Sequence, residues 1–243
     1  MKTLLYYFFI TITLLLFSSK VGAQYLSTYY ITFETSDINV ATHVKIDSNS
    51  IWQIGKPQKV SFTNAYSGQR AIVTDTANPT SVGDTSFFYL FSSANNPPGQ
   101  QYMSFHYRMF CDSLKDYGKV EISGDLGNNW LDLVRDASTY DFYSLTDTIF
   151  TGRTNWKYFT VNYTPWYWDQ FNYPIKRTSD TIIYKFTYIS DSTSIYTDGW
   201  EIDQIYVDSY YIPGGTVENS NNGLKIYPNP VTSSLFIKEN SLI

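Results

Sequence analysis

The densest group of side chains that could bind a ligand lies between Pro165 and Pro174. Five aromatic rings in so short a stretch cannot all point inward from one strand, so we expect some of them on the surface. Exposed flat rings stack on the C–H faces of sugars or anchor protein partners. The alternative is a loop whose rings fold over one edge of the domain and complete a small satellite core. The predicted ligand-binding residues are Trp166, Tyr167, Trp168 and Tyr173.

Catalytic chemistry has few candidates. Cys111 is the only cysteine, and His43 and His106 are the only histidines that could activate it. None of the three lies in a zinc-binding helix motif, a nucleophile elbow or a cysteine–histidine arrangement. We therefore interpret Cys111 as a small buried hydrophobic residue and predict a chain without catalytic activity.

The composition indicates β structure. Aromatic residues make up 19% of the 243 residues and charged residues only 16%. Tyr, Phe and Trp favour half-buried strands, and Asn, Asp, Ser, Thr and Gly favour the turns between them. The formal net charge of −5 argues against a nucleic-acid partner. A single cysteine excludes a disulfide within the chain, so we expect the fold to depend on its core alone.

The first 23 residues have the organisation of a secretory signal peptide. A basic start at Lys2 precedes an apolar run of about 14 residues, and Val21-Gly22-Ala23 ends on a small residue. The run is shorter than the ~20 residues that span a bilayer. We predict cleavage before Gln24, and no membrane span in the protein that remains. A retained membrane anchor is the alternative.

From Tyr25 to Val207 the chain alternates between short apolar runs and polar turns, which predicts an antiparallel β-sandwich. In 102–110, Met103, Phe105, Tyr107 and Met109 fall on one face of the expected strand. The predicted strands are Tyr29–Glu34, Gln58–Phe62, Gln69–Thr74, Ser86–Ser92, Tyr102–Phe110, Lys119–Ser123, Trp130–Val134, Trp156–Tyr163, Thr181–Ile189 and Trp200–Val207. Four tryptophans at strand starts or within strand patterns are expected in the core: Trp52, Trp130, Trp156 and Trp200.

The C-terminal segment reads Leu224-Lys225-Ile226-Tyr227-Pro228-Asn229-Pro230-Val231, with Ser234-Leu235-Phe236-Ile237 after it. It resembles the opening of the type A C-terminal sorting domain of proteins exported by the type IX secretion system. The pattern predicts a strand, a turn around the two prolines, and a second strand. The resemblance covers only the start of such a domain. It implies export by the type IX machinery and a location outside the cell or on its outer surface.

Four phrases within residues 29–208 resemble jelly-roll modules of the MAM-like and cleaved-adhesin type. They are Ile31-Thr32-Phe33-Glu34; the Trp52, Gly55 and Pro57 pattern followed by Ala65-Tyr66-Ser67-Gly68; Gly118–Asp125 with Asn129-Trp130; and Asp198-Gly199-Trp200-Glu201-Ile202-Asp203. The resemblance implies a jelly roll of about ten strands that serves as a binding or adhesive module, without naming its ligand.

The same resemblance implies a structural Ca²⁺ site. In related jelly rolls the carboxylate that ends the first strand lies beside one in the last strand, which here are Glu34 and Asp203. Two adjacent carboxylates repel each other unless a hard cation or a proton intervenes. Asp37 or Asp198 is a further candidate ligand, together with backbone carbonyls. The alternative is that these acids cap turns or pair with a nearby Arg or Lys.

These observations predict an all-β chain in four parts: a signal peptide in 1–23, a jelly-roll β-sandwich in 24–212, a linker in 213–223 and the start of a sorting domain in 224–243. The predicted function is a non-catalytic binding or adhesion module that recognises a glycan or a host or matrix protein. The alternative is an accessory domain of a truncated secreted hydrolase, such as a peptidase or a glycosidase.

Overall fold

The computed structural model describes residues 27–93, 100–133, 142–145, 150–163, 178–193, 197–210, 225–227 and 236–238. The chain divides into two compact units, one ending at Tyr211 and the other beginning at Ile212. The predicted signal peptide, the predicted linker and the aromatic segment between Pro165 and Pro174 lie outside the described residues. In the described part of the chain, no helix has the length and apolar character needed to cross a bilayer.

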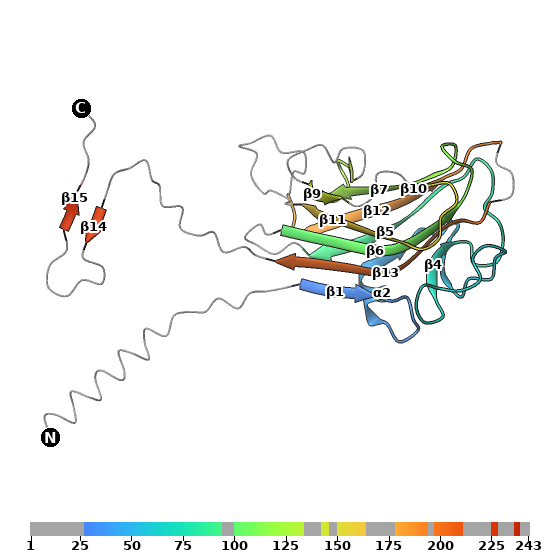
Figure 1. Ribbon diagram of the computed structural model, residues 1–243, viewed down its shortest axis with the longest axis horizontal. Coiled ribbons are helices and arrows are strands. Elements are labelled where there is room, and N and C mark those ends of the chain that lie inside the picture. The colour runs from blue at the N-terminus through green and yellow to red at the C-terminus, as the bar shows by residue number, and fades with distance from the viewer. Residues whose placement is uncertain are drawn as a thin grey trace, which may run out of the picture. The chain divides into compact units, whose positions relative to one another are not determined.

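The first unit is an antiparallel β-sandwich of two sheets, as the sequence predicts (Figure 1). The larger sheet runs in the order β3-β4-β13-β6-β11-β9, with β1 also pairing with β13. Its strands are β1 (Ser27–Ile31), β3 (Trp52–Gly55), β4 (Ala71–Thr74), β6 (Gln100–Phe110), β9 (Phe142–Leu145), β11 (Lys157–Tyr163) and β13 (Gly199–Tyr210).

The smaller sheet runs in the order β10-β7-β12-β5-β2, with β8 also pairing with β7. Its strands are β2 (Val44–Ile46), β5 (Thr85–Ser93), β7 (Tyr117–Ser123), β8 (Leu131–Asp132), β10 (Phe150–Thr151) and β12 (Thr181–Ile189). One short helix, α2 (Ile38–His43), precedes β2, and the Asp37 side chain caps it by accepting a hydrogen bond from the Asn39 N–H.

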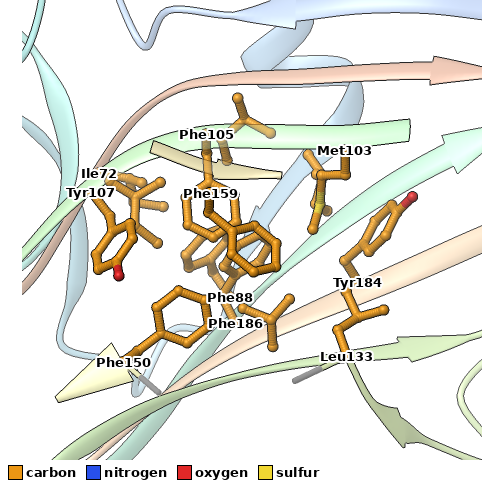
Figure 2. Close-up of a cluster of buried hydrophobic side chains, with 14 of the residues drawn as sticks. Ile72, Phe88, Met103, Phe105, Tyr107, Leu133, Phe150, Phe159, Tyr184 and Phe186 are labelled. Carbon is orange, nitrogen blue, oxygen red and sulfur yellow. The ribbon is translucent and has the colours of Figure 1, made fainter. Parts of the chain in front are cut away.

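Aromatic rings fill the space between the two sheets (Figure 2). Phe105 of β6 packs edge-on against Phe186 of β12, with 5.4 Å between ring centroids, and so joins one sheet to the other. Phe186 also stacks on Phe88 at 4.7 Å, and Phe105 stacks on Phe159 at 4.8 Å. Each fully buried Phe contributes about 1.5–3 kcal/mol. The inward positions of β6 are Met103, Phe105, Tyr107 and Met109, so the predicted alternation is confirmed.

Strand β13 is a central strand of the larger sheet, because it pairs with β4 and β1 along one edge and with β6 along the other. Its register with β6 shifts between Asp203 and Tyr206, and Gln204 in this bulge has a positive φ of 53°. Trp200 and Ile202 point into the core before the bulge, and Ile205 and Val207 do so after it. The extra residue shifts the inward positions from even-numbered to odd-numbered residues at the bulge. The inner face of β13 therefore stays apolar on both sides of the bulge.

The prediction of a strand at Gln58–Phe62 is wrong. This segment is a loop whose N–H groups go to scattered acceptors: Gln58 N–H donates to the Thr76 carbonyl, and Lys59 N–H donates to the Phe62 carbonyl. The buried Lys59 ammonium donates to the backbone carbonyls of Thr74 and Asp198, and burial lowers its pKa to about 8. A charged side chain anchored in this way fixes an irregular backbone where the apolar pattern alone predicts a strand.

The prediction for the tryptophans is right for two of the four. Trp52 and Trp200 are buried in the core, with 5.7 Å between ring centroids. Trp130 and Trp156 are half-buried and lie outside the core cluster, so their predicted placement is wrong. Both precede their strands at positions that face outward, where Trp130 lies under the Lys185 ammonium at 4.3 Å. Cys111 is buried as predicted, and burial raises the pKa of its thiol to about 11.

The second unit contains a β-hairpin. Strand β14 (Lys225–Tyr227) pairs antiparallel with β15 (Phe236–Lys238), and Ile226 lies opposite Ile237. The two strands flank the Pro-Asn-Pro segment, in the order that the sequence pattern predicts.

Candidate functional site

The outer face of the seven-stranded sheet carries a group of aromatic side chains that the core does not use. In β6 the outward positions include Tyr102 and His106, in β13 Tyr206, and in β1 Tyr30. Tyr158 projects from β11 on the same side, because its neighbours Phe159 and Val161 alternate into the core. With Tyr66, which reaches this face from the loop before β4, these residues form what we call the tyrosine face: Tyr30, Tyr66, Tyr102, His106, Tyr158 and Tyr206.

Strand pairing sets the spacing of the rings. Across the sheet, Tyr30 of β1 lies opposite Tyr206 of β13, and Tyr206 lies opposite Ser104 of β6. In the neighbouring row, His106 of β6 lies between Asp203 of β13 and Tyr158 of β11. Large rings therefore surround the small Ser104 side chain. Rings placed on paired strands are held more rigidly than rings on a loop.

Exposure distinguishes this face from the rest of the domain. Tyr30, Tyr66 and Tyr158 are 40%, 44% and 48% exposed, and they are the exposed aromatic residues in the described part of the chain. Aromatic residues on the outer face of the other sheet, such as Tyr89, are half-buried. A surface that leaves several rings open to water offers flat apolar area together with hydroxyl groups.

The tyrosine hydroxyls belong to a polar network on the same face. The Tyr102 and Tyr158 hydroxyls lie 3.0 Å apart and hydrogen-bond to each other. The Tyr206 hydroxyl donates to Asp208 Oδ2 at 3.3 Å, and the Thr28 hydroxyl donates to Asp208 Oδ1 at 2.7 Å. These contacts fix the tips of the rings, so the face presents an ordered set of donors and acceptors.

Tyr66 is placed by a turn that two carboxylates hold. Glu34 Oε1 accepts hydrogen bonds from the N–H groups of Gln69 and Arg70 at 2.8 and 2.9 Å. Asp203 Oδ2 accepts one from the Ser67 N–H at 2.9 Å. A Cβ on Gly68, whose φ is 63°, would lie 2.3 Å from Glu34 Oε1, so this position requires glycine. The turn sets the Tyr66 ring against His106, with 3.7 Å between ring centroids and 15° between ring planes.

Beside the tyrosine face lies a cleft of about 550 Å³, which we call the arginine cleft. It is lined by nine residues, none of them acidic, and Arg108, Arg153, Asn155 and Trp156 are among them. Tyr66 joins the two regions, because its ring contacts His106 on one side and Trp156 on the other, the latter at 5.3 Å. The cleft is within the usual size range of a ligand pocket.

Arg108 is held in place by stacking and by charge. Its guanidinium lies over the rings of Phe62 and Trp156, at 4.9 and 4.7 Å from their centroids. Its Nε donates to Glu201 Oε2 at 2.7 Å, and its Nη2 donates to the Asn64 carbonyl at 2.6 Å. The Glu201 side chain is fully buried, so this carboxylate pairs with Arg108 without reaching solvent.

Burial changes the protonation of the acids beneath this surface. The pKa of Asp203 is raised to about 7: burial raises it most and the nearby Glu34 charge also raises it, while the backbone N–H groups that bond to the carboxyl act in the opposite direction. Burial also raises the pKa of Glu201 to about 7, although Arg108 acts in the opposite direction. The pKa of His106 is lowered because burial disfavours its charged form. Near neutral pH, both buried carboxyls therefore bind a proton more tightly than they would in water.

The structure brings two of the three predicted metal ligands together. Glu34 and Asp203 hold the same turn, whereas Asp198 lies elsewhere and accepts a hydrogen bond from the Ser61 N–H at 2.6 Å. In the described ranges, no group of three or more acidic, histidine or cysteine side chains surrounds one point. A Ca²⁺ at Glu34 and Asp203 would need carbonyl and water oxygens to reach its six to eight ligands. Calcium binding there stays a prediction.

Sequence reasoning missed the tyrosine face. Trp166, Tyr167, Trp168 and Tyr173 lie outside the described residues, so their predicted role stays a prediction. The alternation in 102–110 already places Tyr102 and His106 on the face opposite the core residues. The pairing of β6 with β11 and β13 then adds Tyr158 and Tyr206, and no local pattern shows this pairing.

No model of a protein family matches the chain, and neither does any curated protein. Solved structures with a similar fold include a carbohydrate-binding module, TmCBM61 in complex with β-1,4-galactotriose, at 16% identity and a TM-score of 0.37, covering 73% of this chain and 97% of that one. The K1 cleaved adhesin domain of Lys-gingipain from Porphyromonas gingivalis matches at 13% identity and a TM-score of 0.40, covering 75% and 98%. The CBM22-1 xylan-binding domain of Xyn10C from Paenibacillus barcinonensis matches at 9% identity and a TM-score of 0.41, covering 76% and 94%. Similarities this distant give no information on what this chain binds.

Proposed function

We propose that the chain is a non-catalytic carbohydrate-binding module whose ligand lies on the tyrosine face. The observation that carries the proposal is the set of exposed rings at Tyr30, Tyr66 and Tyr158 over the outer face of one sheet, in a domain whose other described aromatic residues are buried or half-buried. Sugar rings have apolar C–H faces and polar edges, so they suit flat rings bordered by hydroxyl groups. The Tyr102–Tyr158 hydroxyl pair supplies such groups at the edge of the platform.

Two acids of this face, Glu201 and Asp203, are engaged by the protein itself, which supports a binding role for the surface. Glycoside hydrolysis needs two carboxyl groups on either side of a bound sugar. Glu201 and Asp203 are fully buried under the face, the first paired with Arg108 and the second with backbone N–H groups. Neither is positioned to reach a glycosidic bond. Adhesion to a host or matrix protein is the second use of such a surface, because Tyr and Arg are enriched among the residues that dominate protein interfaces.

Affinity electrophoresis of the purified chain tests the proposal, with soluble galactan, xylan and β-glucan as probes. Removing one stacking ring should weaken binding about tenfold, so Tyr158→Ala should lose the mobility shift that a binding polysaccharide causes. Tyr89→Ala is the matched control, because it removes the same side chain from the outer face of the other sheet. Loss of binding in Tyr89→Ala with full binding in Tyr158→Ala would reject the tyrosine face as the site.

We propose further that the chain works outside the cell after export by the type IX secretion system. The support is the signal-peptide pattern in 1–23 and the sorting-domain pattern that begins at Leu224. The test is N-terminal sequencing of the protein collected from culture medium or from the cell surface. A start at Gln24, and loss of export in cells without a working type IX system, are the expected results. Intracellular protein that retains Met1 would exclude this route.

We also propose that Glu34 and Asp203 share a structural Ca²⁺. The two carboxyls hold one turn, and the charge of Glu34 opposes ionisation of Asp203, so a bound cation would relieve their repulsion. An ion that binds only the folded state must stabilise that state.

A further inference from the structure

The arginine cleft differs in charge from the rest of the chain. The whole sequence has 22 acidic and 17 basic residues. The nine residues that line the cleft include two arginines and no acid. A cleft of one charge sign in a protein of the opposite sign concentrates ligands that carry the complementary charge.

Arg108 is prepared to recognise an anion. A guanidinium has five N–H donors. Among the described residues, Arg108 directs only Nε and one Nη2 donor to protein acceptors, at Glu201 and Asn64. The rings of Phe62 and Trp156 both pack against the guanidinium and restrict its movement. A pre-positioned guanidinium with donors left over is the side chain that binds carboxylate or sulfate with the best geometry.

Arg153 supplies a second, more open cation. It is exposed, and its guanidinium lies over the Phe110 ring at 4.4 Å. Within the described ranges it forms no ion pair, in contrast to Arg108. The exposed Asn155 adds an amide to the same wall of the cleft. The cleft thus has one arginine fixed by protein contacts and one whose charge is not neutralised by a described neighbour.

The cleft is continuous with the tyrosine face. Tyr66 contacts both His106 on the face and Trp156 in the cleft. A chain of sugar rings that stacks on the face can therefore place a charged substituent beside the two arginines. The anion then gains charge-assisted hydrogen bonds, while neighbouring rings keep their contacts with the tyrosines.

We propose that the arginine cleft binds the anionic group of an acidic polysaccharide, either a uronate carboxylate or a sulfate ester. This inference rests on the proposed carbohydrate-binding function and specifies the class of its ligand. The cleft supplies the preference for charge, and the tyrosine face supplies stacking that a neutral chain would share.

The experiment compares polysaccharides that differ in charge alone. Polygalacturonate is measured against its fully methyl-esterified form, and carrageenan is measured against its chemically desulfated form. Isothermal titration of the full chain at low and physiological salt gives the affinities. We expect at least one acidic polymer to bind about tenfold more tightly than its neutral counterpart, since hydrogen bonds to charged groups are the stronger kind. The preference should shrink as NaCl is added. The two pairs distinguish carboxylate from sulfate.

Arg153→Met tests the cleft itself, because Arg153 is exposed and its loss leaves no buried carboxylate unpaired. The variant should lose the preference for the acidic polymer by about tenfold and keep its affinity for the neutral one. Lys45→Met is the matched control, because it removes one positive charge from an exposed site on β2 of the other sheet. It should behave as the wild type.

The outcomes separate the two proposals. Equal affinity for charged and neutral polymers, or equal losses in Arg153→Met and Lys45→Met, would overturn the assignment of the cleft and leave the tyrosine face intact. Binding of no polysaccharide at all would overturn the carbohydrate-binding function, and the cleft assignment with it. Loss of the preference in Arg153→Met alone, with neutral binding retained, supports both.

Discussion

Replacing Asp203 by Asn should change how the stability of the domain depends on pH. The Asp203 side chain is buried, and its pKa is raised to about 7, first by burial and then by the Glu34 charge. An unfolded Asp titrates near pH 4. Between about pH 4 and pH 7 the folded chain therefore keeps a proton that the unfolded chain has lost. The free energy of unfolding falls as pH rises through this window, and the loss is complete above it.

The magnitude follows from the two pKa values. From pH 5 to pH 8, one group with these pKa values lowers the free energy of unfolding by roughly 2–3 kcal/mol at most. Asp203→Asn has no proton to lose and removes this dependence. The variant also bears a constant cost, because Asp203 accepts hydrogen bonds from Ser67 and Gln204 on different oxygens and Asn has only one acceptor oxygen. That cost is about 1–3 kcal/mol.

The two effects make the free energies of unfolding of the wild type and the variant converge as the pH rises. At pH 5 the variant should be less stable by about the cost of the lost hydrogen bond, and at pH 8 the two should be nearly equal. The assay is urea unfolding followed by tryptophan fluorescence at several pH values, with EDTA present so that no metal occupies the carboxylates. Asn162→Ala, an uncharged change on the same sheet, should follow the wild type at every pH. A difference between wild type and Asp203→Asn that is the same at pH 5 and pH 8 would refute the titration of a buried carboxyl near neutral pH.

Three further predictions concern packing and calcium. Gly118→Ala should destabilise the fold by about 1–3 kcal/mol, because its Cβ would lie 2.4–2.8 Å from the Trp200 ring, and an unchanged melting temperature would contradict this clash. Phe186→Ala should cost about 3–5 kcal/mol, because this ring bridges the two sheets, and an unchanged urea midpoint would contradict that role. Ca²⁺ should raise the melting temperature of the wild type, EDTA should reverse the effect, and Glu34→Gln should show no response. A melting temperature that is insensitive to both additives would remove the calcium site.

Local sequence patterns predicted correctly those strands whose apolar and polar residues alternate regularly. Thr181–Ile189 is both a predicted and an observed strand, and the alternation of Met103, Phe105, Tyr107 and Met109 places the core on the correct face of β6. The predictions fail where the local structure depends on contacts with residues that are distant in the sequence. The Gln58–Phe62 segment is a loop because the buried Lys59 bonds to carbonyls of Thr74 and Asp198.

The candidate site is assembled from residues that are far apart in the sequence and that strand pairing brings together. Tyr102 and Tyr158 are 56 residues apart in sequence, and they meet only because β6 pairs with β11. The carboxylates behave differently: the pattern that pairs Glu34 with Asp203 does identify two groups that hold one turn. What the sequence does not reveal is that this turn presents Tyr66 to His106, which places the acids beneath a platform of rings.

An NMR titration of the chain with ¹³C-labelled tyrosine rings tests directly which tyrosine rings contact a sugar ligand. The spectrum is recorded as a binding oligosaccharide is added, and each ring is assigned by single substitution. We expect the signals of Tyr30, Tyr66 and Tyr158 to shift in proportion to occupancy while the signal of Tyr89, on the opposite sheet, stays in place. Shifts at Tyr89 or Tyr173 with none at Tyr30, Tyr66 and Tyr158 would show that the ligand binds elsewhere.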